Sequence, residues 1–318
     1  MKSFGLMKDL LCTYVALSGE GTRFIRRLKR MTKGRESSRL KQFMFSEEQR
    51  AATLRMLIRC DRCFSEVIDK DTCNLIKRDR SAVYGRMIPF AWATLGFHCR
   101  ILDAFGIAHD AAAEERSVFT AFAHREWNDL IDEYGFSFRD IYRASETQEE
   151  IPHQLILVKK LRQKQKKIAP PEKFAKYCEH LKNYQELAPL TVRDNAELAE
   201  RVVSEGALYI ARAHVYLMVK DVPRELEEVL VPVSKWFSSL DELTDIESDQ
   251  TSRRITFMSL VSDPEEEIWK QCRNCVDAFR QLAPHPEKMI DFIEITTRSV
   301  VNGRGDILDI EKRLATAS

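Results

Sequence analysis

The stretch Leu240-Asp241-Glu242-Leu243-Thr244-Asp245-Ile246-Glu247-Ser248-Asp249 decides how this chain is interpreted, because its aspartates recur at every fourth residue. On an α-helix a step of four residues turns by about 40°, so Asp241, Asp245 and Asp249 form one slanted stripe. Like charges on such a stripe repel each other, and divalent cations bound to carboxylate oxygens would remove the repulsion. The spacing therefore predicts a helix face that binds metal ions.

The alternative for this stretch is a solvated acidic face, since Glu242 and Glu247 widen the acidic band. Its setting favours a functional site. Apolar segments at 231–237 and 255–261 flank the stripe, and both are expected to be buried.

The composition is that of a soluble globular chain with long helices. Of 318 residues, 44% are hydrophobic and 31% are charged, and only 11 glycines and 10 prolines are present to form turns. The formal net charge of +1 gives no bias toward nucleic acid. There is no apolar run long enough to span a bilayer, and eight scattered cysteines do not make a disulfide scaffold. A reducing, cytoplasmic compartment is expected.

Capping and turn residues predict some ten helices, which together would form a single large bundle. The sequence shows no alternation of apolar and polar residues typical of strands. Ser46-Glu47-Glu48-Gln49 is a capping box, Gly135 is a helix end, and Asp263-Pro264 is a helix start. The expected helices cover 46–69, 81–105, 111–134, 137–145, 154–167, a segment from 171, 195–220, a segment from 223 through the aspartate stripe, 264–282 and 286–302. The fold class is therefore all-α, a single helical bundle.

Two regions are expected: a basic N-terminal helical segment at 1–45 and an α-helical domain at 46–318. Within 22–42 the basic residues interleave with apolar ones; they are Arg23, Arg26, Arg27, Lys29, Arg30, Lys33, Arg35, Arg39 and Lys41. One interpretation is a helix lying on an anionic membrane surface, which would make the protein peripheral to a membrane. The other is a solvated helix with a loose tail.

A second acidic cluster lies at Asp129-Leu130-Ile131-Asp132-Glu133, near the end of the helix expected at 111–134. Acids at a helix C-terminus oppose the helix dipole, so this placement is unfavourable without a positive partner. The three acids are helical neighbours at three and four residues. Two acidic faces on two helices can share metal ions across a bundle.

The two acidic motifs resemble those of class I terpene synthases, which carry Asp-x-x-Asp with a further acid on one helix and metal ligands at i, i+4 and i+8 on another. More narrowly, residues 240–257 resemble the bacterial tetraprenyl-β-curcumene synthase family of large-terpene synthases. The matching positions are Asp129, Asp132 and Glu133 in the first motif, and Asp241, Asp245, Asp249 and Phe257 in the second. The resemblance covers residues 75–310 and implies a class I isoprenoid synthase bundle with a central apolar cavity, in which these six acids bind Mg²⁺.

The same resemblance implies three arginines as candidate site residues. Arg298 falls where the family has an arginine. Arg253 and Arg254 replace part of the family's Gly-Asp-Leu-Asn and lie one turn beyond Asp249, where forked hydrogen bonds to a substrate diphosphate are expected. The alternative for that pair is ordinary cations at a helix end. A further departure is Phe136, which stands where the family has an additional aspartate.

The implied activity is that of a Mg²⁺-dependent terpene cyclase that ionises a linear prenyl diphosphate and releases pyrophosphate. Asp129, Asp245 and Arg298 are the expected catalytic residues, because metal ions and arginines stabilise the charge that gathers on the leaving group. Two alternatives remain. One is a prenyl chain-elongating or head-to-head synthase, and the other is a non-catalytic helical adaptor that binds partners through 22–42 and 159–167.

Aromatic and cysteine residues allow two interpretations each. The aromatic side chains line a carbocation pocket or pack an ordinary core; they are Phe90, Trp92, Phe97, Phe122, Trp127, Trp236 and Phe237. The Cys-x-x-Cys pairs at 60–63 and 272–275 resemble half of a zinc site each, but both lie inside expected helices and far apart. Buried thiols are the favoured interpretation of the cysteines.

Overall fold

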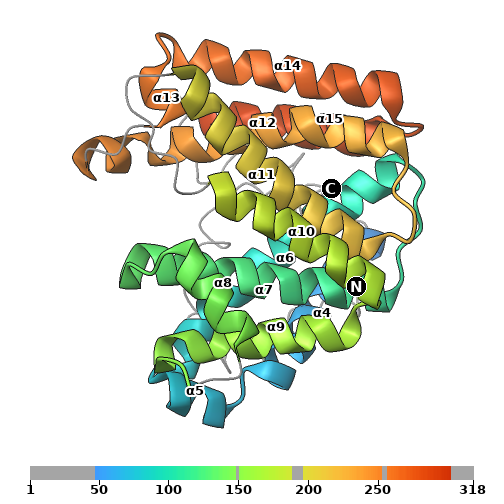
Figure 1. Cartoon of the computed structure of the whole chain (residues 1–318). Coiled ribbons are helices and arrows are strands. Elements are labelled where there is room, and N and C mark those ends of the chain that lie inside the picture. The colour runs from blue at the N-terminus through green and yellow to red at the C-terminus, as the bar shows by residue number, and fades with distance from the viewer. Residues whose placement is uncertain (1–46, 148–149, 188–195, 253–255, 302–318) are drawn as a thin grey trace, which may run out of the picture.

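The computed structural model describes residues 47–147, 150–187, 196–252 and 256–301, and within these ranges the chain is helical without a strand (Figure 1). The elements are α4 (Glu47–Val67), α5 (Lys70–Ile76), α6 (Arg80–Ala104), α7 (Ala111–Tyr134), α8 (Phe138–Glu146), the 3₁₀ turn η1 (His153–Leu155), α9 (Ile156–Ile168), α10 (Pro171–Leu187), α11 (Ala196–Met218), α12 (Arg224–Ser252), α13 (Phe257–Leu260), α14 (Pro264–Leu282) and α15 (Glu287–Val301). The expected all-α fold is confirmed.

Several helix starts follow from side chains that satisfy the free backbone N–H groups of the first turn. The Asp110 carboxylate accepts the Ala113 N–H at 2.7 Å at the start of α7, and Asp263 accepts the Glu266 N–H at 3.0 Å at the start of α14. Gly135 ends α7 with a φ of 69°, a left-handed conformation that a residue without a Cβ adopts freely.

Two short helices were not expected from the sequence. The first expected helix ends at Val67, and α5 follows it because the Asp69 carboxylate accepts the Thr72 N–H at 2.7 Å. The one-turn helix α13 follows α12, and the Glu242 carboxylate of α12 accepts the Met258 N–H at 2.9 Å. Neither helix is long enough to show an amphipathic period in the sequence.

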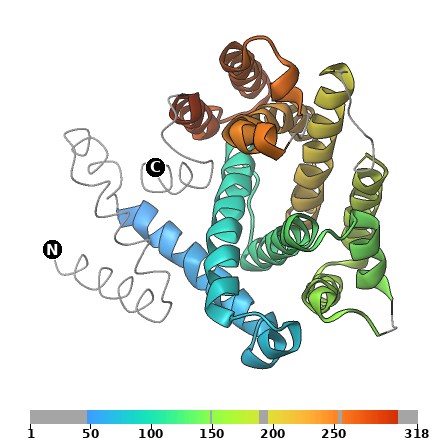
Figure 2. The same ribbon diagram turned by 90° about the vertical axis from the view of Figure 1, so that its left-hand side faces the viewer.

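Helix α7 lies at the centre of one half of the bundle and packs against α4, α6, α8, α9 and α11. Helix α12 belongs to the other half, the upper part of Figure 1, where it packs against α14 and α15. Helix α11 contacts both α7 and α12 and so joins the two halves. Figure 2 shows α6 and α11 as two upright helices.

The aromatic residues pack with one another inside this bundle. Phe97 lies 5.5 Å from Phe237 and 5.8 Å from Phe292 between ring centroids, and Trp236 donates its indole N–H to the Thr297 hydroxyl at 2.9 Å. Of the expected aromatic set, Trp92, Phe97, Phe122, Trp127 and Trp236 are buried, while Phe90 and Phe237 are half-buried. Their contacts are those of packed core side chains.

Several expectations concern other parts of the chain. The basic segment at 22–42, the capping serine Ser46, and Arg253 and Arg254 lie outside the described residues. The Cys-x-x-Cys pairs lie within α4 and α14, as expected, and their four thiols are free and buried. In the part of the chain that the structure describes, there is no helix long and apolar enough to cross a membrane.

Candidate functional site

The carboxylate of Asp129, near the C-terminal end of α7, is held by three arginines. Its Oδ1 atom lies 2.7 Å from Nη2 of Arg125, one turn earlier on α7. Its Oδ2 atom lies 3.2 Å from Nη2 of Arg78 and 3.5 Å from Nη1 of Arg86. Both oxygens of Asp129 therefore contact an arginine. The side chain is only 2% exposed, so these ion pairs lie largely out of contact with water.

A second buried carboxylate, Glu126, stands beside Asp129. Arg78, which lies two residues before the start of α6, donates from Nη1 to both Glu126 oxygens, at 2.7 and 2.8 Å. Burial raises the pKa of Glu126 to about 7, and neighbouring Asp129 and Glu133 act in the same direction, while the Arg78 guanidinium opposes them. The pKa of this carboxyl is therefore raised even though Arg78 donates to both of its oxygens.

The outer end of this acidic cluster is open to solvent. Glu133 pairs with Arg86, and these two side chains are 43% and 42% exposed. Asp132 lies on the same helix, and its side chain is outside what the structure describes. Of the first-motif acids, Asp129 is thus inside a charged cluster and Glu133 lies at its surface.

The aspartate stripe lies where the spacing predicts, on one continuous helix. Residues 241–252 belong to α12, so Asp241, Asp245 and Asp249 are separated by four residues each along a regular α-helix. Asp241 is exposed. The side chains of Asp245 and Asp249 are not among those described.

The two acidic helix ends lie at the same side of the molecule. In Figure 1 both α7 and α12 run from right to left, so that Asp129 and the stripe lie toward their left-hand ends. Figure 2, viewed from that side, shows the ends of both helices turned toward the viewer. The backbone therefore brings the two motifs to one end of the bundle.

The remaining expected site residues lie elsewhere or carry other contacts. Arg298 is exposed in the last turn of α15, a helix that packs against α6, α12 and α14. Phe136 is half-buried and packs against the hydrophobic core just after α7. Phe257, which matches the second motif, is buried at the start of α13.

The arginines around Asp129 are functional candidates that the sequence reasoning missed. The Arg125–Asp129 pair could have been predicted from the sequence, because Arg and Asp four residues apart on a helix form an ion pair. Arg78 and Arg86 are 51 and 43 residues from Asp129 in the chain, and no local pattern predicts such long-range pairs. These positive charges offset part of the repulsion expected among acids at this helix end.

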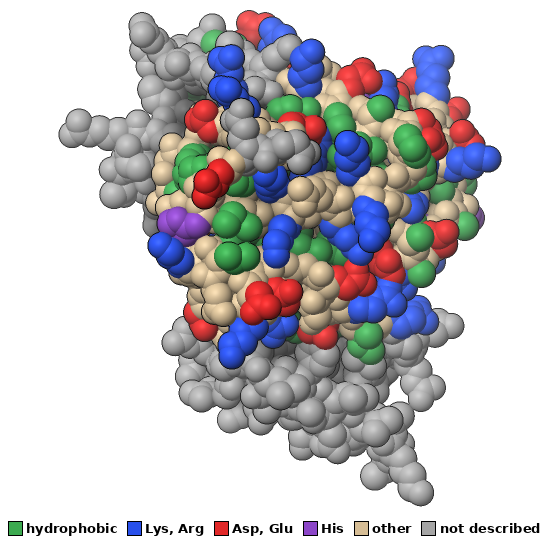
Figure 3. Space-filling model, turned by 60° about the horizontal axis from the view of Figure 1, so that its bottom comes forward, with side chains coloured by type: hydrophobic (Ala, Val, Ile, Leu, Met, Phe, Trp, Pro, Cys, Tyr) green, Lys and Arg blue, Asp and Glu red, His purple; other side chains and the backbone are tan. Residues whose placement is uncertain are grey.

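The basic stretch at 159–167 is not a continuous positive surface. Arg162 is buried and donates to Glu146 at 2.8 Å, Lys160 donates to the Thr72 hydroxyl at 2.7 Å, and Lys164 pairs with Glu66. On the face shown in Figure 3, Lys and Arg side chains are interspersed with Asp and Glu. A large part of this positive charge is therefore used within the fold.

Three buried histidines meet where α6, α7 and α11 pack together. His214 Nε2 lies 3.0 Å from His124 Nδ1, and the rings of His98 and His214 stack with centroids 4.4 Å apart. His98 Nδ1 lies 2.7 Å from the Thr94 carbonyl. Within the described residues, the Nε2 atoms of His98 and His124 have no hydrogen-bond partner. A positive charge on this cluster would be poorly solvated.

Acidification from pH 7.5 to 5.5 is expected to lower the free energy of unfolding by about 2–4 kcal/mol. Burial lowers the pKa of His98 to about 4 and of His124 to about 3, and it lowers the pKa of His214 well below 6.5. Below pH 6.5 the unfolded state therefore takes up protons that the folded state does not, which costs up to about 1.4 kcal/mol per pH unit for each histidine. Glu126 acts in the opposite direction, because its raised pKa lets the folded state bind a proton first as the pH falls.

Urea unfolding at a series of pH values measures this dependence. The His124→Asn variant should show a slope about 1 kcal/mol per pH unit shallower than the parent between pH 6.5 and 5. His153→Gln, in the 3₁₀ turn outside the cluster, should keep the parental slope. A slope in His124→Asn that equals the parental slope would show that His124 is not buried in its neutral form.

The comparisons with known proteins bear on the fold. No family model matches the chain, and no curated protein matches it. Among solved structures, it is similar to a geranyltransferase from Legionella pneumophila, with a TM-score of 0.53, 12% sequence identity, and coverage of 81% of this chain and 99% of the other. The chain thus has an all-helical fold of the isoprenoid synthase type.

Proposed function

We propose that this chain is a Mg²⁺-dependent class I terpene synthase that ionises a linear prenyl diphosphate, releases pyrophosphate and forms a cyclic or rearranged terpene. The observation that carries the proposal is the shared fold, which extends over 99% of the geranyltransferase chain. The aspartate spacing on α12 supports the cyclase over a chain-elongating enzyme. The structural neighbour is named a transferase. The second candidate function is therefore a prenyl chain-elongating or head-to-head synthase.

In this proposal Mg²⁺ is bound by the stripe on α12 and by the first-motif acids Asp129, Asp132 and Glu133. The donor set fits the ion, since Mg²⁺ prefers carboxylate oxygens together with substrate phosphates. Asp241 and Glu133 are exposed carboxylates of this kind. Asp129 is different, because arginines contact both of its oxygens, so an ion bound there would share this carboxylate with them.

The positive side chains are assigned to the diphosphate. Arg253 and Arg254 would bind it just beyond the stripe, and Arg298 would stabilise the charge that develops as the carbon–oxygen bond breaks. Arg86 and Arg125, which are partly exposed beside Asp129, supply further guanidinium groups at the same end of the bundle. The bound magnesium would add charge stabilisation at the leaving group.

The test is incubation of the full chain with Mg²⁺ and linear prenyl diphosphates of ten to thirty-five carbons, each alone and in pairs. A cyclase is expected to release pyrophosphate and a hydrocarbon from a single substrate. Products longer than the substrate, formed either from one diphosphate alone or only when five-carbon isopentenyl diphosphate is also added, would support the transferase alternative instead. Absence of pyrophosphate release from every substrate would support the third alternative, a helical adaptor that retains the fold without catalysis.

Compartment and surface contacts remain part of the proposal. We place the enzyme in the cytoplasm, with the basic segment at 22–42 as its contact with an anionic membrane surface. The mixed charge of the α9 region offers little support to a large basic binding face there.

A further inference from the structure

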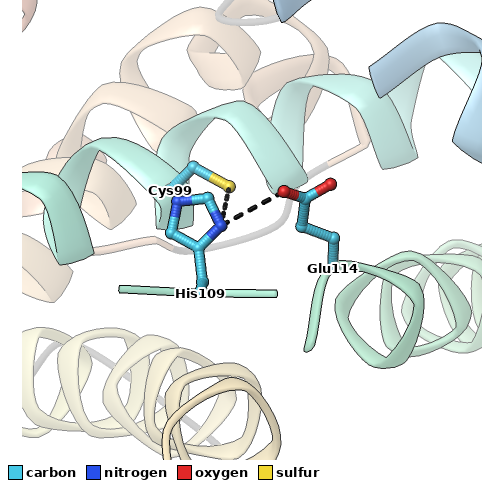
Figure 4. Close-up of side chains that lie close together, drawn as sticks. All are labelled: Cys99, His109 and Glu114. Carbon is cyan, nitrogen blue, oxygen red and sulfur yellow. Dashed lines mark hydrogen bonds and ion pairs between the residues drawn. The ribbon is translucent and has the colours of Figure 1, made fainter. Parts of the chain in front are cut away.

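A cluster of three different metal-ligand types lies where α6 turns into α7. Cys99 is in the penultimate turn of α6, His109 lies in the connecting loop, and Glu114 is in the first turn of α7. Figure 4 shows the thiol and the carboxylate directed toward the same side of the imidazole ring. The loop that carries His109 is fixed by backbone hydrogen bonds, including that from the Ile107 N–H to the Leu102 carbonyl at 2.9 Å.

The ligand atoms already lie close to the spacing of a tetrahedral metal site. His109 Nδ1 is 3.9 Å from Cys99 Sγ and 3.2 Å from Glu114 Oε1, and one ligand atom from each of the three residues lies within 4.8 Å of the others. Bond lengths of about 2.0–2.3 Å around a tetrahedral zinc ion place neighbouring ligand atoms roughly 3.4–3.6 Å apart. Around a bound ion the Cys99 Sγ–His109 Nδ1 distance would shorten slightly from 3.9 Å, and the Cys99–Glu114 distance, which is at most 4.8 Å, would shorten toward the same spacing.

Two further side chains hold the ligands in position. Asp103 Oδ1 lies 3.5 Å from His109 Nε2, the ring nitrogen that faces away from the cluster, and Arg59 of α4 pairs with Glu114 Oε2 at 2.8 Å. A carboxylate on the second nitrogen is the usual support of a metal-binding histidine, because it fixes the tautomer that leaves the other nitrogen free. Arg59 likewise leaves Glu114 Oε1 directed at the cluster.

The donor types favour zinc over magnesium or calcium. A thiolate and an imidazole are soft or intermediate ligands that bind zinc well, whereas Mg²⁺ and Ca²⁺ prefer oxygen. The charges also balance, since one thiolate and one carboxylate match a divalent ion. Cys99 is 2% exposed, and the His109 and Glu114 side chains are each 16% exposed, so the site is enclosed yet reachable.

We propose that Cys99, His109 and Glu114 bind one zinc ion, with a water molecule as the fourth ligand, and that the ion fixes the α6–α7 loop. The site goes beyond the proposed terpene synthase activity. Glu114 and Asp129 are 15 residues apart on α7, which at a rise of 1.5 Å per residue separates this cluster from the proposed magnesium site by about 22 Å. Its chemistry is therefore separate from the diphosphate-binding end.

Cobalt and zinc titrations of the full chain, after removal of metal by a chelator, test this assignment. One equivalent of Co²⁺ should give a thiolate-to-cobalt charge-transfer absorption and the visible bands of a tetrahedral ion, and one equivalent of Zn²⁺ should abolish both. Cys99→Ser should remove the charge-transfer absorption. His109→Gln should weaken zinc binding by at least tenfold, and Asp103→Asn by about tenfold, as expected for a supporting residue.

The double variant Cys272→Ser/Cys275→Ser is the matched control, because it removes two buried thiols from α14 and leaves the cluster intact. It should bind cobalt with the same spectrum as the parent. A spectrum that survives in Cys99→Ser and His109→Gln, or that disappears in the α14 variant, would overturn the proposal. So would a parent protein that binds no stoichiometric Zn²⁺. Circular dichroism of each variant establishes that a lost spectrum is not lost folding.

Discussion

Asp129→Asn is expected to lower the free energy of unfolding by about 2–4 kcal/mol. Asparagine keeps the shape of the side chain but removes the charge that three guanidinium groups share. Arg78 and Arg86 keep Glu126 and Glu133 as partners, whereas Arg125 has no other carboxylate partner in the described part of the chain. The expected loss of stability is smaller than that for breaking a fully buried ion pair, because Arg86 and Arg125 are partly exposed to water.

Urea unfolding followed by circular dichroism measures this effect, with Glu133→Gln as the control. Glu133 and Arg86 are both exposed, so this second substitution should cost less than about 1 kcal/mol. Equal stability of the two variants would mean that the arginines do not hold Asp129 in solution. A gain in stability for Asp129→Asn would mean that repulsion among the acids dominates this helix end.

Asp245→Asn is expected to remove most turnover on the substrate that the incubation experiment identifies, without a loss of stability. The substituted amide keeps the shape but loses the charge that would hold the proposed magnesium ion, and a lost electrostatic contact at a reacting centre costs about a hundredfold or more in rate. Stability should stay the same or rise slightly without Mg²⁺, because one repelling charge leaves the stripe.

Product formation and melting curves with and without Mg²⁺ and diphosphate distinguish this outcome from a structural role. Glu228→Gln, an exposed residue on α12 that pairs with Arg224, should keep full turnover. Asp129→Asn should also lose most turnover, measured per folded molecule to allow for its lower stability. Full turnover in both aspartate variants would show that the acidic motifs are surface features and that the enzyme proposal is wrong.

Local sequence signals predicted the helices well because capping residues act within one turn. Gly135 and Asp263 mark helix boundaries through contacts at three or four residues, which a pattern can reveal. The prediction failed at α5 and α13, where a helix of one or two turns depends on what it packs against.

The candidate site was predictable only where it depends on spacing along one helix. The stripe at Asp241, Asp245 and Asp249 follows from helical geometry alone. The charges that surround Asp129 come from the approach to α6 and from α6 itself, and their positions depend on how α6 packs on α7. The cluster around His109 was missed for the same reason, since the path of the α6–α7 loop in the folded chain brings His109 beside Cys99 and Glu114.

Because α7 carries Asp129 near one end and Glu114 near the other, substitutions at these two residues have independent effects on the energy of the molecule. Sites this far apart, without shared partners, usually have additive effects on the free energy of unfolding to within about 0.3–0.5 kcal/mol. A combined variant of both residues should therefore lose the sum of the two single losses. A larger discrepancy would measure a coupling energy that this helix transmits between the two ends of the bundle.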